Sequence, residues 1–311
     1  MNALLFANSG NQELVDDLFA HLQTMRGFEG LRLGNMKLMF HPDGEPFVEI
    51  YDNVRRRLCI VIGCIAANGS RSVNDHAMET FVLLDALMRA DANVDVLALP
   101  YLPYARQDRR KGAKTDRTAI TSVLFANFLK HAAPIGRICA VEPHDAHIEG
   151  FFTSPSFDRV PVIHRFSEPM KALCPDMDSV VIVSPDRGGW ERASALASVI
   201  GTPQPIAWVD KRRPAPGEVK VHQFIGETKG KDAIIVDDMI DTAGSLVKTA
   251  ELIAEEHPRR IFACAVHGLF NGNAIERILT SPIERVMVTN SVRQKQAVLA
   301  CEKIQVLRIG D

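Results

Sequence analysis

Short apolar runs alternate with helical patterns along almost the whole chain, and this alternation restricts the fold more than any other feature. The runs with strand character are LCIVIGCI, VDVLALPYL, RICAVEP, SVVIVSPD, PIAWVDKR, DAIIVDD and RIFACAVHGLF. Helical patterns lie between them, over residues 73–90 and about 118–131, and again from Trp190 and from Leu246. Strands that alternate with helices predict an α/β fold, in which mainly parallel sheets are flanked by helices.

The length of the chain, 311 residues, exceeds what a single hydrophobic core usually serves, so we expect two domains. The segment GFFTSPSFDRVPV, residues 150–162, carries Gly, Ser and Pro between two series of strands and helices. We therefore expect an N-terminal domain over residues 1–151 and a C-terminal domain over residues 152–311.

Composition argues against a general affinity for nucleic acid or membranes. The formal net charge is -2, so any anion-binding site must be local. The longest apolar run, residues 58–67, is about half of the ~20 residues that a membrane helix needs. The six cysteines form no CxxC pair, and most lie in apolar runs, as buried reduced thiols would. Together with an N-terminus unlike a signal peptide, these features predict a cytoplasmic protein.

The segment IIVDDMIDTAGSL, residues 234–246, places acids and small residues at the end of a strand. We expect the strand to cover residues 233–236 and DDMIDTAGS to form a tight turn into a helix, where ligands bind in α/β sheets. Small residues let backbone amides approach a phosphate at the positive end of the helix. Asp237 and Asp238 would repel that phosphate, so they should face hydroxyls or a cation. A sugar phosphate meets both demands; the alternative is an acidic surface turn that caps the helix.

Three further segments carry groups suited to phosphates. SPDRGGW puts Asp186 at a strand end and two glycines where the backbone can approach an anion or a metal, although such glycines also occur in plain turns. YARQDRR, residues 104–110, contains three arginines and an amide, and its alternative is a solvated basic loop. DKRRPAPGE, residues 210–218, holds three consecutive cations that could close over a reacting phosphate; a surface hairpin connection is its alternative.

The segment EPHDAHIEGF, residues 142–151, places His144 and His147 among three acids. One or two of these side chains could reach a magnesium ion or its waters, because a polyphosphate favours a hard, oxygen-bound cation. A dedicated zinc site is the alternative.

Together these segments resemble the ribose-phosphate diphosphokinase family, also called phosphoribosyl pyrophosphate synthetases. VDDMIDTAGS is similar to the family's ribose-5-phosphate loop, SPDRGG to its pyrophosphate loop, YARQDRR to an ATP-contacting segment and DKRRP to its catalytic flexible loop. PHDAHIEGFF, HPDGE, VTNS and VNDHAMETFVLLDALMRA also resemble family segments, and the order of the motifs agrees.

The resemblance implies two tandem phosphoribosyltransferase-type domains and a role for each candidate residue. The catalytic cations would be Lys211 and Arg213. The ribose-5-phosphate site would consist of Asp237, Asp238, Asp241, Thr242, Ala243, Gly244 and Ser245. The pyrophosphate loop would consist of Asp186, Arg187, Gly188 and Gly189. ATP would contact His41, Asp43, Glu45, Arg106, Gln107 and His144, and the ligands of magnesium would be His144 and Asp186.

The implied reaction is the magnesium-dependent transfer of the diphosphoryl group of ATP to the anomeric hydroxyl of ribose 5-phosphate, which gives phosphoribosyl pyrophosphate and AMP. The N-terminal domain would be the ATP side, and the C-terminal domain would hold the sugar phosphate. A homo-oligomer, at least a dimer, would share the ATP site between subunits.

The chain departs from the family pattern on the nucleotide side. His41 stands where a phenylalanine of the family stacks on adenine, and the histidine segment is changed at Glu142, Pro143, His147 and Glu149. These changes leave open diphosphoryl transfer to a larger 5-phosphoribosyl acceptor such as ADP-ribose. A base phosphoribosyltransferase also stays open, because DDMIDTAGS by itself occurs in that wider class, as does a non-catalytic regulatory homologue.

Overall fold

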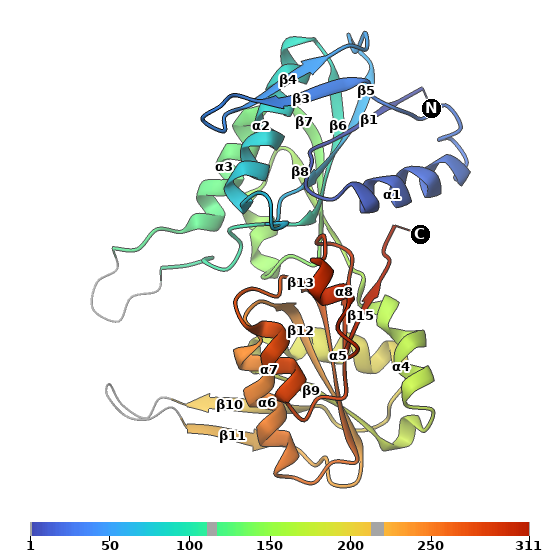
Figure 1. Ribbon diagram of the computed structural model, residues 1–311, viewed down its shortest axis with the longest axis vertical. Helices are drawn as coiled ribbons and strands as arrows, with labels where there is room; N and C mark the ends of the chain where they lie inside the picture. The colour runs from blue at the N-terminus through green and yellow to red at the C-terminus, as the bar shows by residue number, and fades with distance from the viewer. Residues whose placement is uncertain (1, 111–116, 213–220, 311) are drawn as a thin grey trace. The chain divides into compact units, whose positions relative to one another are not determined.

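The computed structural model describes residues 2–110, 117–212 and 221–310, and the chain divides into two compact units (Figure 1). Unit 1 comprises residues 1–161, 291–293 and 310–311, and unit 2 comprises residues 162–290 and 294–309. Arg213, one of the two expected catalytic cations, lies outside the described residues. Among the described helices, none combines the length and the apolar character that crossing a membrane requires.

Unit 1 is built on a six-stranded parallel sheet with the strand order β2-β1-β5-β6-β7-β8. Its strands are β1 (Leu4–Ala7), β2 (Arg32–Leu33), β5 (Leu58–Cys64), β6 (Asn93–Tyr101), β7 (Ile135–Val141) and β8 (Ser156–Val160). Its helices are α1 (Gln12–Thr24), α2 (Val73–Arg89), α3 (Thr121–Ala132) and the 3-10 helix η1 (Ala146–Phe151). A separate antiparallel hairpin, β3 (Met36–Phe40) and β4 (Pro46–Ile50), packs against α2.

Helix α2 shows how local sequence sets the elements of unit 1. Ser72 begins the helix with a capping box: its hydroxyl accepts the amide of Asp75, and the carboxylate of Asp75 accepts the amide of Ser72. Leu83, Leu84 and Leu87 then recur on one face and are fully buried in the core of the unit. Each such side chain contributes about 1.5–3 kcal/mol when it is removed from water, so the helix is stable only on the sheet.

Unit 2 is a seven-stranded sheet with the order β11-β10-β9-β12-β13-β14-β15, in which only the β10–β11 pair is antiparallel. Its strands are β9 (Val180–Ser184), β10 (Ala207–Arg212), β11 (Val221–Ile225), β12 (Asp232–Ile240), β13 (Arg260–Gly268), β14 (Arg285–Thr289) and β15 (Ile304–Leu307). Its α-helices are α4 (Ser167–Leu173), α5 (Trp190–Ile200), α6 (Gly244–Ala254), α7 (Ala274–Thr280) and α8 (Gln296–Leu299). Its 3-10 helices are η2 (Ile163–Phe166), η3 (Met177–Ser179) and η4 (Arg187–Gly189).

The central strands of unit 2 are buried on both faces, which explains their continuous apolar sequences. Every residue of β9 is buried, as are the first five residues of β12. The exception to apolar character is Asp232, which opens β12 at the core. Its carboxylate accepts hydrogen bonds from the guanidinium groups of Arg259 (2.6 Å) and Arg260 (2.5 Å), so this buried charge is paired.

One expectation about this sheet needs correction. Strand β12 does not end at Val236 but continues through Asp237 and Asp238 to Ile240. The reason is that β13 remains paired with it, with Asp237 opposite Ala265 and Ile240 opposite Gly268. The acid pair therefore belongs to the strand, and the turn before α6 is limited to residues 241–243.

Candidate active site

An acid pair stands near the carboxyl end of β12, shortly before α6 begins. The side chain of Asp237 is 27% exposed, whereas Asp238 is buried. The amide of Asp238 donates a hydrogen bond to Oδ1 of Asp237 (2.8 Å), and Nη1 of Arg192 lies 3.9 Å from the same oxygen. Burial raises the pKa of Asp237 to about 8, and the charge and side-chain hydrogen bond of Asp238 act in the same direction, whereas Arg192 and the amide hydrogen bond of Asp238 lower it. Asp237 therefore favours its protonated form more than an ordinary carboxyl group does.

The turn from β12 to α6 leaves the start of the helix open to an anion. Ala243 adopts φ 58° and ψ 6°, a left-handed conformation that is strained for alanine. It is the N-cap residue of α6, and no described side chain caps this end of the helix. The first amides of a helix lack partners within it and carry the positive end of its dipole. Residues 242–245 therefore present backbone donors suited to a phosphate.

Two residues that the sequence analysis did not select hold this turn from the segment after β13. Asn271 donates from Nδ2 to Oδ1 of Asp241 (2.8 Å) and from its amide to the carbonyl of Asp241 (2.9 Å). Arg277, on α7, donates from Nη1 to the carbonyl of Thr242 (2.9 Å). The carboxylate of Asp241 is thus engaged by Asn271, so its part in binding an anion would rest on its backbone. Asn271 lies 30 residues from Asp241, and Arg277 lies 35 residues from Thr242, so no local motif could indicate these contacts.

The turn after β9 is closed by the side chain of Asp186. Its Oδ1 accepts hydrogen bonds from the amides of Gly188 (2.9 Å) and Gly189 (3.2 Å). A Cβ on Gly189 would lie 2.6 Å from Oγ of Ser184, so a side chain at this position would force the Ser184 hydroxyl to move. The two amides that the sequence suggested for an anion are therefore engaged by Asp186 in this structure.

Strand β10 brings the start of the cationic segment, residues 210–212, beside this turn, because β10 and β9 are parallel neighbours. Nε of Arg187 lies 3.4 Å from Oδ1 of the buried Asp210. Lys211 is the next residue of β10, with its side chain outside the described part. Since β10, β9 and β12 are adjacent and parallel, the turns after β9 and β12 and the described start of the cationic segment lie at the same edge of the sheet.

Unit 1 carries candidates at the carboxyl ends of two adjacent strands. Arg106 and Gln107 follow β6, and His144 follows its parallel neighbour β7. The carbonyl of Gln107 accepts hydrogen bonds from the amide (3.3 Å) and the hydroxyl (3.0 Å) of Ser122, at the start of α3. This contact fixes the ATP-contacting segment expected from the sequence onto α3.

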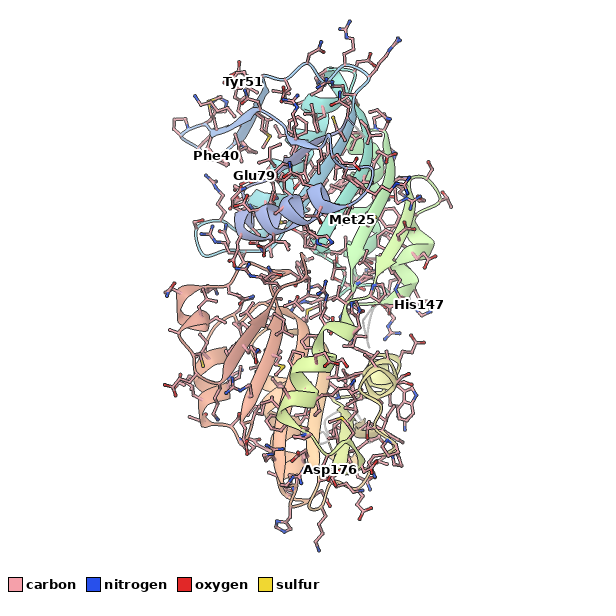
Figure 2. All side chains as sticks on the ribbon, turned by 90° about the vertical axis from the view of Figure 1, so that its right-hand side faces the viewer. Met25, Phe40, Tyr51, Glu79, His147 and Asp176 are labelled. Carbon is pink, nitrogen blue, oxygen red and sulfur yellow. The ribbon has the colours of Figure 1, made fainter. Side chains whose placement is uncertain are left out.

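His147, labelled in Figure 2, forms a close pair with Asp145 in unit 1. Oδ1 of Asp145 lies 2.6 Å from Nδ1 of His147 and accepts the amide of the same residue (2.7 Å). Burial tends to raise the pKa of Asp145, but the hydrogen bonds from His147 outweigh burial and lower it. An ionised Asp145 thus orients the exposed imidazole.

The remaining nucleotide-side candidates, His41, Asp43 and Glu45, stand at the exposed tip of the β3–β4 hairpin, next to Phe40 (Figure 2). The amide of His41 donates to the carbonyl of Glu45 (2.9 Å), and Oδ1 of Asp43 accepts the amide of Glu45 (3.2 Å). Gly44, at φ 97°, supplies the left-handed residue of this turn. The backbone of the tip is therefore ordered by its own hydrogen bonds.

The candidate metal ligands fit magnesium better than zinc. Within the described residues, no three His, Cys, Asp or Glu side chains stand close enough to hold a metal by themselves. Zinc is held by three or four such ligands, whereas magnesium keeps several waters and is held by one or two carboxylates together with substrate phosphates. Asp186, one of the two expected magnesium contacts, and the Asp237–Asp238 pair offer hard oxygen ligands of the second kind, and the other expected contact, His144, offers a nitrogen that suits a water on the ion. The zinc alternative has no support in the described part of the chain.

The fold and the candidate site are those of an α/β enzyme that acts on phosphorylated ligands at the carboxyl ends of its strands. Residues 3–133 match the family model of the N-terminal domain of ribose phosphate pyrophosphokinase, and residues 202–311 match that of the phosphoribosyl synthetase-associated domain. The chain belongs to the ribose-phosphate pyrophosphokinase family.

Individual relatives cover nearly the whole chain. The ribose-phosphate pyrophosphokinase of Vibrio parahaemolyticus serotype O3:K6 is 37% identical, over 98% of this chain and 92% of its own. That of Bacillus subtilis is 36% identical, over 94% and 86%. The crystal structure of phosphoribosylpyrophosphate synthetase from Mycobacterium smegmatis matches with a TM-score of 0.85 at 28% identity, over 100% of this chain and 95% of the other. The family resemblance and the α/β fold class expected from the sequence are thereby confirmed.

Proposed function

We propose that this chain is a ribose-phosphate pyrophosphokinase that transfers the diphosphoryl group of ATP to the anomeric hydroxyl of ribose 5-phosphate. The observation that carries the proposal is the meeting of an acid pair, Asp237 and Asp238, with an uncapped helix start at the end of one strand. These groups complement the hydroxyls and the phosphate of a sugar phosphate, and family membership supplies the reaction. The relatives are named ribose-phosphate pyrophosphokinase. Their names do not favour transfer to a larger acceptor, a base phosphoribosyltransferase or a regulatory homologue.

In the proposed mechanism, residues 152–311 hold the acceptor. Asp237 and Asp238 accept hydrogen bonds from the ribose hydroxyls, and residues 241–245 hold the 5-phosphate mainly through their backbone. The anomeric oxygen forms a bond to the β-phosphorus of ATP, its proton is released, and the bond from the β-phosphorus to the α–β bridging oxygen breaks. AMP then leaves with that bridging oxygen.

Charge stabilisation is the main contribution that the protein makes to such a transfer. We assign it to Lys211 and Arg213. The position of Lys211 supports this assignment, because β10 carries it beside the turn of Asp186 to Gly189, which we assign to the pyrophosphate group.

Residues 1–151 are the ATP side in this proposal. Arg106, Gln107 and His144 follow adjacent strands and would contact the nucleotide and its phosphates. His41, Asp43 and Glu45 would contribute to an ATP site shared between subunits of a homo-oligomer, at least a dimer.

Magnesium is the cofactor that we propose, with His144 and Asp186 as its protein-side contacts. When bound, it neutralises charge on the polyphosphate as the diphosphoryl group moves. We also propose a cytoplasmic location, which the six free cysteines support.

The direct test is release of AMP from ATP and magnesium in the presence of ribose 5-phosphate, read by mass spectrometry. Equal amounts of AMP and phosphoribosyl pyrophosphate are expected. Matched reactions with unphosphorylated ribose and with ADP-ribose show whether the 5-phosphate is required and whether a larger acceptor is used. A folded sample that releases no AMP with ribose 5-phosphate would contradict the proposal.

A further inference from the structure

Arg277 places a guanidinium group against the turn that we assign to the 5-phosphate, from a different part of the sequence. It stands on α7, and its Nη1 donates to the carbonyl of Thr242 at 2.9 Å. The same atom lies 3.3 Å from the position that a Cβ on Gly244 would take. The guanidinium group thus lies at the first residues of the uncapped helix start.

The positive charge of Arg277 is available to a ligand. Among the residues that the structure describes, no Asp or Glu forms an ion pair with it, and its side chain is only partly buried. The hydrogen bond to Thr242 engages one of the five N–H donors of the guanidinium group. The planar arrangement of the others suits bidentate binding of a phosphate.

The turn itself lacks a cation. Residues 237–245 contain three acids and neither Lys nor Arg, so a phosphate bound there would face an excess of negative charge. The helix dipole offers only about half a positive charge. Lys248, the next cation along the chain, lies one turn into α6 and is exposed, with no hydrogen bond to residues 241–245 in the described structure.

We infer that Arg277 is a further substrate-binding residue, which contacts the phosphate group of the sugar phosphate directly. The inference rests on the proposed function, because it takes residues 241–245 as the phosphate site. A purely structural role, in which Arg277 only supports the carbonyl of Thr242, is the reading that the experiment must separate from it.

Two variants separate charge from support. Arg277→Gln keeps an N–H donor for the carbonyl of Thr242 but loses the charge, and Arg277→Lys keeps the charge but loses the planar fork. Arg277→Gln should raise KM for ribose 5-phosphate about ten- to a hundredfold, the range for a lost hydrogen bond to a charged group. KM for ATP should stay within about twofold, and Arg277→Lys should be intermediate. The matched control, Lys248→Gln, should leave both constants unchanged.

A binding measurement tests the role of Arg277 independently of whether the enzyme catalyses the proposed reaction. Binding of ribose 5-phosphate alone, by calorimetry, should weaken in Arg277→Gln by the same factor as KM. If the wild type releases no AMP, the proposed function fails, while the binding comparison still tests Arg277. Unchanged affinity in a folded Arg277→Gln would overturn the inference. Equal weakening of both substrates together with a lower melting temperature would assign Arg277 to structural support only.

Discussion

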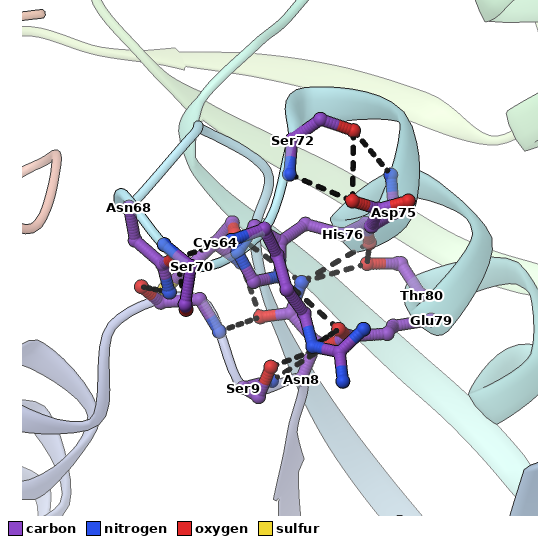
Figure 3. Close-up of polar contacts among 12 residues, drawn as sticks. Asn8, Ser9, Cys64, Asn68, Ser70, Ser72, Asp75, His76, Glu79 and Thr80 are labelled. Atoms are coloured by element: carbon purple, nitrogen blue, oxygen red, sulfur yellow. Dashed lines mark hydrogen bonds and ion pairs between the residues drawn. The ribbon is translucent and has the colours of Figure 1, made fainter. Parts of the chain in front are cut away.

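The guanidinium group of Arg71 lies over the ring of Phe40, with 3.2 Å between Cζ and the ring centroid. Nε of Arg71 is also 3.6 Å from Oε1 of Glu79, a buried carboxylate on α2. The other oxygen of Glu79 accepts hydrogen bonds from the amide (3.0 Å) and the hydroxyl (2.8 Å) of Ser9, after β1 (Figure 3). Arg71 therefore joins the β3–β4 hairpin, through Phe40 at the end of β3, to α2 and to the segment after β1.

Replacement of Arg71 by alanine should loosen this hairpin. The change removes a cation–π contact, worth about 0.5–2 kcal/mol, and leaves the buried Glu79 less compensated. We expect the free energy of unfolding to fall by about 2 kcal/mol and the amides of β3 and β4 to exchange faster with solvent. Arg89→Ala is the matched control, because Arg89 forms only an exposed pair with Asp85 and should change stability by under ~0.5 kcal/mol. Equal exchange in the two variants would show that Arg71 does not hold the hairpin.

Affinity for ribose 5-phosphate should depend on the ionisation of Asp237. Because the pKa of Asp237 is raised to about 8, chiefly by burial, the acid accepts hydroxyl donors more fully as pH rises through 8. We expect kcat/KM for ribose 5-phosphate to increase over this range. Asp238→Asn removes a neighbouring charge that raises this pKa, so the rise should move to lower pH. A profile that stays in place in Asp238→Asn would refute the coupling of the two acids.

The same pKa predicts how stability depends on pH. The pKa of Asp237 in the folded protein lies above its ordinary value of 3.8, so its contribution to stability is fully present below pH 3.8 and is lost as pH rises through about 8. Asp237→Asn does not lose stability in this way, because asparagine does not ionise. The melting temperature of the variant relative to that of the wild type should therefore rise by a few degrees from pH 5 to pH 9. A constant difference across this range would show that Asp237 ionises normally in the folded protein.

Asp232, the buried acid at the start of β12, should affect the pH dependence of stability in the opposite direction from Asp237. Burial acts to raise the pKa of Asp232, but hydrogen bonds and charges from Arg259 and Arg260 lower it to about 2. This lowered pKa stabilises the fold above pH 3.8, and the contribution is lost as pH falls through 2. Asp232→Asn should cost about 2–3 kcal/mol at pH 7, which is the free energy that corresponds to lowering the pKa from 3.8 to about 2.

The measurement for Asp232→Asn can use the tryptophans of the chain. Its two tryptophans, Trp190 and Trp208, both belong to unit 2, so their fluorescence follows the unfolding of that unit in urea. Glu251→Gln, on the exposed side of α6, is a control that should unfold like the wild type. A loss of under ~1 kcal/mol in Asp232→Asn would mean that the arginines find other partners.

Local periodicity was sufficient to predict the helices and strands that flank the candidate site. The sequence predicts β9, β12 and α6 because their apolar residues follow the periods of strands and helices. The extension of β12 through Asp238 could not be predicted, since it depends on pairing with β13. The contact of Arg277 with Thr242 could not be predicted either, because only the folded chain brings α7 beside this turn. The assignments of His41, Lys211 and Arg213 remain predictions that the resemblance supports.

Replacement of Lys211 by alanine tests the assignment of catalysis to β10. Loss of a cation that stabilises the developing charge on the diphosphoryl group should lower kcat on the order of a thousandfold. Lys211 lies at the end of an edge hairpin, so the melting temperature should change little, and KM for ribose 5-phosphate should stay close to that of the wild type. Lys229→Ala removes an exposed lysine of the same unit and should leave kcat unchanged. A Lys211→Ala enzyme with normal turnover would remove this residue from the mechanism and leave the charge stabilisation to other groups.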